Sequence, residues 1–270
     1  MLKQDLYREI ARNLDELTGE FVAGSGCSLN AFISSDLIFP EIDHLRGHEV
    51  FVPSAVGLAG IARVIASYGA ATHGAFVAAT LPVVPSTNTD FWVFKRFRTS
   101  DMRAAVDRAM GMARMFYLDT YAPVITLVAT QYEYTVPSGM DFVGYLQLVP
   151  TSGSDYKATD DIKNVFELRQ PFWRLEQNVI TFDPRRISLS DLDKQPVKVI
   201  GQSRPAALGT NNSVVPSQLE EYLIMRSSQI LASRRLGQGN EWTLINKQFT
   251  DMAENLELYL RTQARGDEVR

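Results

Sequence analysis

The sequence predicts an α+β protein, with a small bundle of about four helices and an inserted, mostly antiparallel β region. Near both ends of the chain, apolar residues recur at three- and four-residue steps, which is typical of amphipathic helices. In the middle the apolar period shortens to two, which is typical of half-buried strands. The predicted domains are a helical one at 1–123 and 202–270, with a small strand insertion at about 48–97, and a β-rich one at 124–201.

The first predicted helix covers about residues 2–17 and is followed by Gly19, a residue type that commonly ends helices. Its apolar face consists of Leu2, Leu6, Ile10, Leu14 and Leu17. The glycine- and serine-rich segment 19–30 predicts a loop. Runs of small residues alternating with larger apolar ones at 61–68 and 74–81 then predict a strand pair.

A further strand at 91–97 leads into a second helix, which begins at Thr99 or Ser100 because either hydroxyl can cap it. Beyond Pro123 the pattern becomes that of strands. These strands are predicted at 128–136, 142–148, 165–169, 172–175, 179–182 and 197–200. Gln177-Asn178 is expected to close a hairpin between two of them.

The last two predicted helices follow a polar linker at 201–217. The third begins at Ser217, which forms a capping box with Glu220, and it runs to about Arg234. Two glycines separate it from the fourth helix. The packing seam of the fourth helix advances by 3-4-3-4-3 steps and consists of Trp242, Ile245, Phe249, Met252, Leu256 and Tyr259. So regular a seam predicts a long helical contact.

The composition of the chain argues against several classes of function. The formal net charge of −4 argues against a protein built mainly to grip nucleic-acid phosphates. Cys27 is the one cysteine of the 270 residues, so an internal disulfide is impossible and a reducing compartment fits best. The charged N-terminal helix does not resemble a signal peptide. Arg63 and His73 interrupt the apolar stretch 56–84, which favours strands over a membrane span.

The sequence contains no strong candidate for a catalytic or metal-binding group of residues. His44 and His48 stand four residues apart beside Asp43, but Pro40 and Gly47 oppose the helix that a metal site at this spacing needs. No nucleophile motif accompanies the histidines, and Cys27 has no supporting base. We therefore expect no enzymatic activity, no metal and no cofactor.

Aromatic side chains gather in the strand-rich middle. They are Tyr132, Tyr134, Phe142, Tyr145, Phe166, Phe172, Trp173 and Phe182. A stacking platform for bases or sugars is one interpretation. A β core is favoured, because aromatic residues of strands more often pack a core and the few nearby basic side chains, such as Arg185-Arg186, do not form a clear funnel.

Three stretches carry a resemblance to a known family. They are the opening "LYREIARNLDEL", the passage from "RVIASYGAATHG" to "RFRTSDMRAAVDRAM", and "SRPAALGTNNSVVPSQLEEYLIMRSSQILASRR". In their order of elements they resemble the head–tail connector (adaptor, or neck) proteins of tailed bacteriophages. "STNTDFWVF" departs from the family pattern, because a glycine is expected before Asp90.

The resemblance implies a structural virion protein. Copies would form a homo-oligomeric ring, commonly twelvefold, that joins the portal to the tail or a second neck protein and extends the DNA channel, with transient non-specific DNA contact. The protein would assemble in the bacterial host cytoplasm, reside in the virion neck and contact no membrane. Alternatives are a sixfold tail-completion or tail-terminator protein or, from another class, a β-rich glycan- or nucleic-acid-binding module.

Portal docking is expected at the polar tail 262–270, since flexible terminal segments can order on contact with a partner. The residues expected to dock are Arg234, Arg235, Arg261, Arg265, Asp267, Glu268 and Arg270.

Overall fold

The computed structural model describes residues 1–41, 43–113, 118–137, 140–148, 167–168, 171–203, 208–211 and 213–264. The chain divides into two compact units. The first unit comprises Met1–Met110 and Ala207–Leu256, and the second comprises Gly111–Ala206 and Glu257–Arg270. The domain boundaries expected from the sequence stay a prediction.

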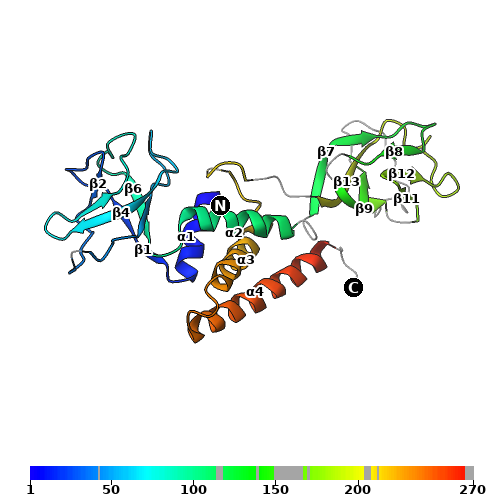
Figure 1. Ribbon diagram of the computed structural model, residues 1–270. Coiled ribbons are helices and arrows are strands. Elements are labelled where there is room, and N and C mark those ends of the chain that lie inside the picture. Colours follow the sequence, from blue (N-terminus) through cyan, green and yellow to red (C-terminus); the bar gives the residue numbers. More distant parts are fainter. Residues whose placement is uncertain are drawn as a thin grey trace. The chain divides into compact units, whose positions relative to one another are not determined.

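Figure 1 shows the elements in chain order. The helices are α1 (Lys3–Asn13), α2 (Thr99–Ala113), the 3-10 helix η1 (Ser217–Leu219), α3 (Glu220–Ser233) and α4 (Asn240–Ala264). The strands of the first unit are β1 (Leu17–Val22), β2 (Ala31–Ile33), β3 (Glu49–Phe51), β4 (Ala62–Gly69), β5 (Gly74–Val77) and β6 (Asp90–Phe94). Those of the second are β7 (Leu118–Thr126), β8 (Glu133–Thr135), β9 (Met140–Leu148), β10 (Glu167–Leu168), β11 (Trp173–Glu176), β12 (Val179–Phe182) and β13 (Pro196–Ser203).

The predicted fold class is wrong. Within the described residues the protein is a β-rich α+β fold with three antiparallel sheets, rather than a small helical bundle carrying an inserted β region. The strands between α1 and α2 form a six-stranded sheet in the order β1-β6-β3-β4-β5-β2. Several of these strands are only three to five residues long, and their pairing partners lie far away in sequence, so their local apolar patterns were too short to reveal a sheet.

The first helix ends earlier than predicted. Asp15 adopts a left-handed backbone with φ 53°, so the helix cannot continue to Leu17. Leu17 instead opens β1 and pairs with Phe94 of β6. The predicted loop at 19–30 therefore begins four residues too early, because β1 extends to Val22.

The core of the six-stranded sheet is aromatic. Phe91 stacks on Phe21 at 5.6 Å between ring centroids, and Phe32 lies 5.0 Å from Phe91. These rings come from β6, β1 and β2, so they join the two edge strands through one cluster. Tyr7 of α1 meets Phe51 of β3 edge-on at 6.2 Å, which attaches the first helix to the sheet.

Helix α1 is fixed at its N-terminus by the segment that precedes α3. The amide of Lys3 donates to the Ser213 carbonyl at 2.9 Å, and the amide of Gln4 donates to the Asn211 carbonyl at 3.0 Å. The Lys3 ammonium, with 2% of its side chain exposed, contacts Asp107 at 2.9 Å and donates to the Leu208 carbonyl at 2.7 Å. These bonds join the start of the chain to α2 and to the segment that precedes α3. Helix α1 also packs directly against α3.

The second unit contains two sheets, in the orders β10-β9-β13-β7 and β11-β12-β8. They share one apolar core, in which Leu146 and Val199 of the larger sheet pack with Ile180 and Phe182 of the smaller one. The predicted hairpin is confirmed: Gln177 and Asn178 connect β11 to β12 with positive φ angles of 44° and 66°.

Candidate functional site

His44, His48 and Cys27 all contact neighbouring residues of the first unit. The His44 ring stacks on Phe39 at 4.7 Å, and His48 Nδ1 lies 3.3 Å from the Thr18 hydroxyl. Cys27 Sγ accepts the amide hydrogen of Ile33 at 3.3 Å. Among the residues that the structure describes, no group of three or more His, Cys, Asp or Glu side chains could hold a metal ion. That the protein is not an enzyme stays a prediction.

The aromatic residues of the strand-rich middle pack mainly inward where their side chains are described. Tyr134, Trp173 and Phe182 are buried, and the Trp173 indole donates to the Leu168 carbonyl at 2.6 Å. Phe172 is exposed. The side chains of Phe142 and Phe166 lie outside the described residues. For the buried residues, the core interpretation is confirmed.

The turn between α3 and α4 is attached to the start of α2. Arg234 forms an ion pair with Asp101 at 3.1 Å. The Arg235 guanidinium lies 5.1 Å above the Phe97 ring, and that ring meets Trp242 of α4 edge-on at 6.0 Å. Two residues expected to dock on the portal therefore make internal contacts that hold the beginning of α4 in place.

A buried carboxylate lies in the same unit. Glu16 accepts the backbone amide of Arg96 at 2.8 Å, and the Arg96 guanidinium lies 3.8 Å away. Burial raises the pKa of Glu16, and the charges of Arg96, Lys95 and Arg235 oppose that rise. The surroundings of Glu16 thus disfavour its charged form overall.

Helix α4 carries the predicted packing seam, and the seam changes character along its length. Trp242 and Phe249 are buried, and Ile245 and Leu256 are half-buried. Met252 is 38% exposed and Tyr259 is exposed as well. A 3-4 repeat averages 3.5 residues per turn, whereas a straight helix has 3.6, so the seam drifts by about 20° per heptad around the helix. The drift carries its later residues away from the face that starts in the core.

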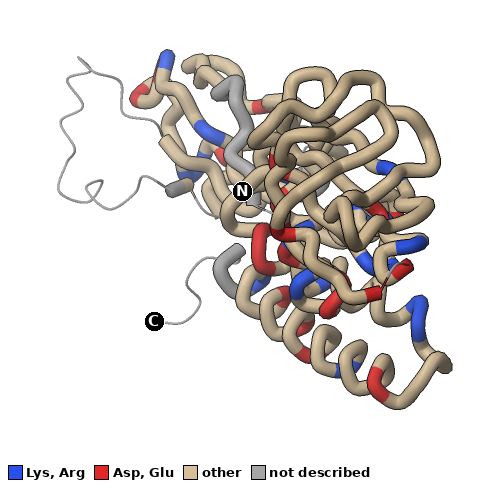
Figure 2. The backbone as a smooth tube through the Cα atoms, turned by 90° about the vertical axis from the view of Figure 1, so that its left-hand side faces the viewer, with Lys and Arg blue, Asp and Glu red and all other residues tan. Residues whose placement is uncertain are grey.

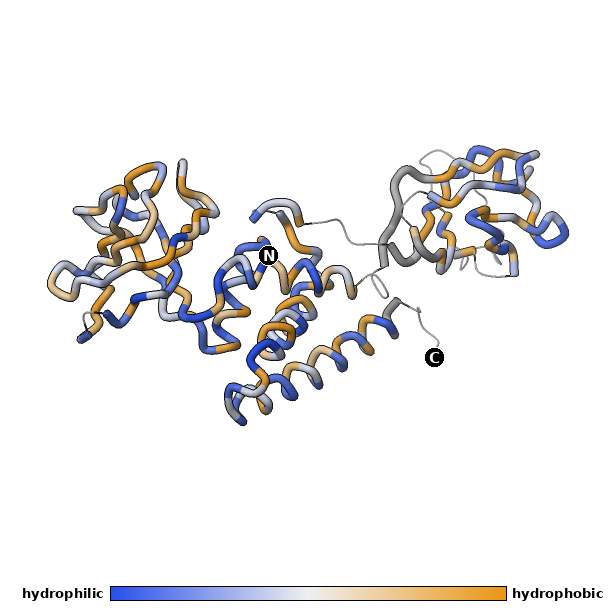
Figure 3. The backbone as a smooth tube through the Cα atoms, viewed as in Figure 1, coloured by the Kyte–Doolittle hydropathy of each residue, from blue (hydrophilic) through white to orange (hydrophobic). Residues whose placement is uncertain are grey.

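The opposite side of α4 also holds apolar residues. Leu244 is 69% exposed and Leu258 is 63% exposed. Figure 3 shows hydrophobic residues recurring along this helix, and Figure 2 shows acidic residues at intervals along it. Leu236, in the turn before α4, is exposed too. The helix thus combines a buried face with an apolar, acidic outer face.

The predicted docking tail, residues 262–270, falls within the described residues only as far as residue 264. Arg261 forms an ion pair with Glu257 one turn earlier. Arg265, Asp267, Glu268 and Arg270 lie outside the described residues. None of the described helices is long and apolar enough to cross a membrane.

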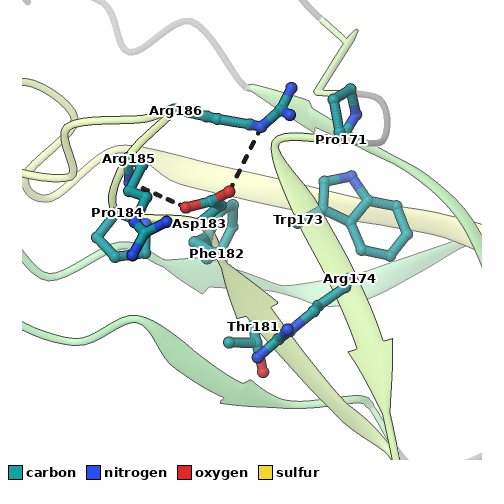
Figure 4. A pocket seen from close by; sticks show the side chains of 9 residues that line it. All are labelled: Pro171, Trp173, Arg174, Thr181, Phe182, Asp183, Pro184, Arg185 and Arg186. Carbon is teal, nitrogen blue, oxygen red and sulfur yellow. Dashed lines mark hydrogen bonds and ion pairs between the residues drawn. The ribbon is translucent and has the colours of Figure 1, made fainter.

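The second unit has an arginine-lined hollow that the sequence alone does not reveal. The hollow measures about 610 Å³ and is lined by Pro171, Trp173, Arg174, Thr181, Phe182, Asp183, Pro184, Arg185 and Arg186. Figure 4 shows the Asp183 carboxylate between Arg185 and Arg186. It accepts the Arg185 amide at 2.9 Å and contacts the Arg186 guanidinium at 3.4 Å. Arg174 could have been recognised as outward-facing, because it lies between two apolar strand residues, the buried Trp173 and the half-buried Leu175.

No protein-family model matches this chain, and no curated protein does either.

Proposed function

We propose that the protein is a structural subunit of a ring-forming head–tail connector that joins the portal of a tailed bacteriophage to its tail and extends the DNA channel. The observation that carries the proposal is the exposed apolar side of α4. A helix of 25 residues with exposed Leu244 and Leu258 on one side is suited to pack against another subunit.

The three sequence stretches that resemble connector proteins support the same proposal. They correspond to α1, to the run from β4 to α2, and to α3. These elements belong to the first compact unit, in which α1 packs on α3 and the Lys3 ammonium contacts Asp107 of α2. A packed scaffold of this kind would hold α4 rigidly for contact with neighbouring copies.

The charge of the chain also suits a conduit. A net charge of −4 leaves little excess cation to bind the phosphate backbone as DNA passes through a ring. Contact with packaged DNA would be transient and non-specific.

Docking on the portal is assigned to the polar segment 262–270. Arg261 and Glu257 lie just before it on α4, and the segment adds Arg265, Asp267, Glu268 and Arg270. Arg234 and Arg235 would take part through their solvent-accessible parts, because Arg234 keeps 46% of its side chain exposed beside Asp101.

The decisive experiment is electron microscopy and native mass measurement of the purified protein, alone and with portal. Twelvefold rings on the portal are expected. Sixfold rings that bind tail tubes would favour a tail-terminator protein, and failure to bind the portal would contradict the connector proposal. Sequence-independent gel shifts or glycan-array binding by the isolated protein would favour the β-rich binding module.

The docking segment has its own test. A chain truncated after Arg261 should keep its melting temperature, because the removed residues lie at the end of α4 and beyond it. It should fail to attach to filled heads. Normal attachment by this truncated chain would contradict the assignment of the docking segment.

A further inference from the structure

The outer face of the sheet β11-β12-β8 carries charges of both signs. Direct cross-strand partners project from the same face of a sheet, and Arg174 of β11 pairs with Thr181 of β12, which pairs with Glu133 of β8. One row across the sheet therefore runs from a cation, through a hydroxyl, to an anion. In the next row Glu176 pairs with Val179.

Thr181 of this face lines two hollows. The arginine-lined hollow of about 610 Å³ contains Arg174, Arg185 and Arg186. The second hollow, of about 520 Å³, is lined by Glu133, Glu176, Gln177, Val179 and Thr181. The face is thus hollowed and basic on one side, and hollowed and acidic on the other.

Most of these charges are already neutralised within the chain. Arg174 pairs with Glu176 at 3.2 Å, and Arg186 pairs with Asp183 at 3.4 Å. Two charges are not neutralised in this way. Within the described residues, neither the Arg185 guanidinium nor the Glu133 carboxylate forms an ion pair. They have opposite signs and lie on opposite sides of the same face.

This charge arrangement discriminates between partners. A nucleic-acid backbone or another polyanion would be attracted to Arg185. It would be repelled by the like charges of Glu133 and Glu176 in the adjoining hollow. A partner surface with one anion and one cation at the same separation could pair with both Arg185 and Glu133. A second copy of this chain is such a surface, because its own face offers an unpaired Glu133 and an unpaired Arg185.

We infer that the outer face of the sheet β11-β12-β8 is a two-fold contact between two copies of this chain, in which Arg185 of each copy meets Glu133 of the other. The inference goes beyond the proposed ring, because a face that pairs with itself closes at two copies, whereas a ring joins two different faces. Charge pairs at such a contact select the partner and the register, while the filling of the hollows excludes water. The contact belongs to the free protein in solution and requires no portal.

A charge-swap series tests this contact by sedimentation of the full chain at low and at moderate salt. Arg185→Glu alone, or Glu133→Arg alone, should weaken self-association about tenfold or more, because each places like charges opposite one another. The double variant Arg185→Glu/Glu133→Arg should restore it to within about threefold, because the attraction is re-formed with its signs exchanged. Arg46→Glu, which changes an exposed arginine of the first unit, is the matched control and should leave association unchanged.

The inference is overturned if the wild-type chain stays monomeric up to about 1 mM, if the single swaps associate like the wild type, or if the double swap does not recover. It is also overturned if a 20-base-pair DNA duplex or inorganic phosphate binds the wild type and Arg185→Glu abolishes that binding. Wild-type dimers that respond to the swaps support the contact whether or not rings form on the portal. Wild-type self-association that responds to the swaps, without any binding to portal, would support the contact and refute the connector.

Discussion

Helices α1 and α4 are both amphipathic in sequence, yet the structure uses them differently. Helix α1 buries its apolar face and even a lysine, Lys3, whose ammonium contacts Asp107 of α2 and the Leu208 carbonyl. Helix α4 buries Trp242 and Phe249 but leaves Leu244 exposed. A helix whose polar groups find partners inside the chain is part of the scaffold, whereas a helix with uncovered apolar residues has a face left for a partner.

The largest effect should come from placing a charge on the buried face of α4. Phe249→Asp should lower the free energy of unfolding by about 3–5 kcal/mol, because it removes an apolar ring and leaves an unpaired buried carboxylate. Leu256→Asp should cost less, because Leu256 is only half-buried. Urea denaturation of the purified variants measures both. If Phe249→Asp unfolded like the parent protein, the buried face of α4 would be misassigned.

A smaller loss is expected on α1. Lys3→Met removes the ammonium from the Leu208 carbonyl and from Asp107, and should cost about 1–3 kcal/mol, because a buried acceptor loses its donor. The matched control is Lys247→Met on the exposed side of α4, which should change stability by less than about 0.5 kcal/mol. Equal effects of the two substitutions would remove the distinction between the helices.

The pH dependence of stability should arise in part at His48, which precedes β3 and contacts Thr18 of β1. Burial, and then the charges of His44 and Lys95, lower the pKa of His48 from its ordinary value of 6.5. As the pH falls through 6.5, the unfolded chain therefore takes up a proton before the folded one, and the free energy of unfolding decreases. Chemical denaturation between pH 7.5 and 5.5 should show this loss, and His48→Gln should reduce it.

Glu16 provides a control of opposite sign. Because its pKa in the folded unit is raised above 4.5, its contribution to stability is fully present below that pH and is lost as the pH rises through the raised value. Glu16→Gln should remove that loss. A pH profile that neither substitution alters would contradict the assigned role of burial at these two residues.

The smallest effect on stability should come from the outer face of α4. Leu244→Asp should change the free energy of unfolding by less than about 0.5 kcal/mol, because the side chain is already 69% exposed. It should nevertheless reduce ring formation on the portal, which negative-stain images can count. Rings that form normally with this variant would show that the outer face of α4 near Leu244 is not a subunit contact.

Short-range features were predictable from the sequence. The second helix, the hairpin at Gln177-Asn178 and the inward packing of Trp173 follow from patterns within a few residues, and the structure contains them. The candidate surfaces were predictable only in part. The seam of α4 was visible as a repeat, but the arginine-lined hollow joins Arg174 to Arg185 across a strand pair, and no local motif marks it.

What the sequence by itself determined is the local period: where α4 lies, which of its residues share a face, and where β11 turns into β12. Only the tertiary structure decided which apolar residues are covered, because burial depends on partners that are distant in the chain. Phe249 and Met252 belong to one repeat, yet one is buried and the other exposed. Arg234 meets Asp101 across 133 positions of sequence, a pairing that no local pattern encodes.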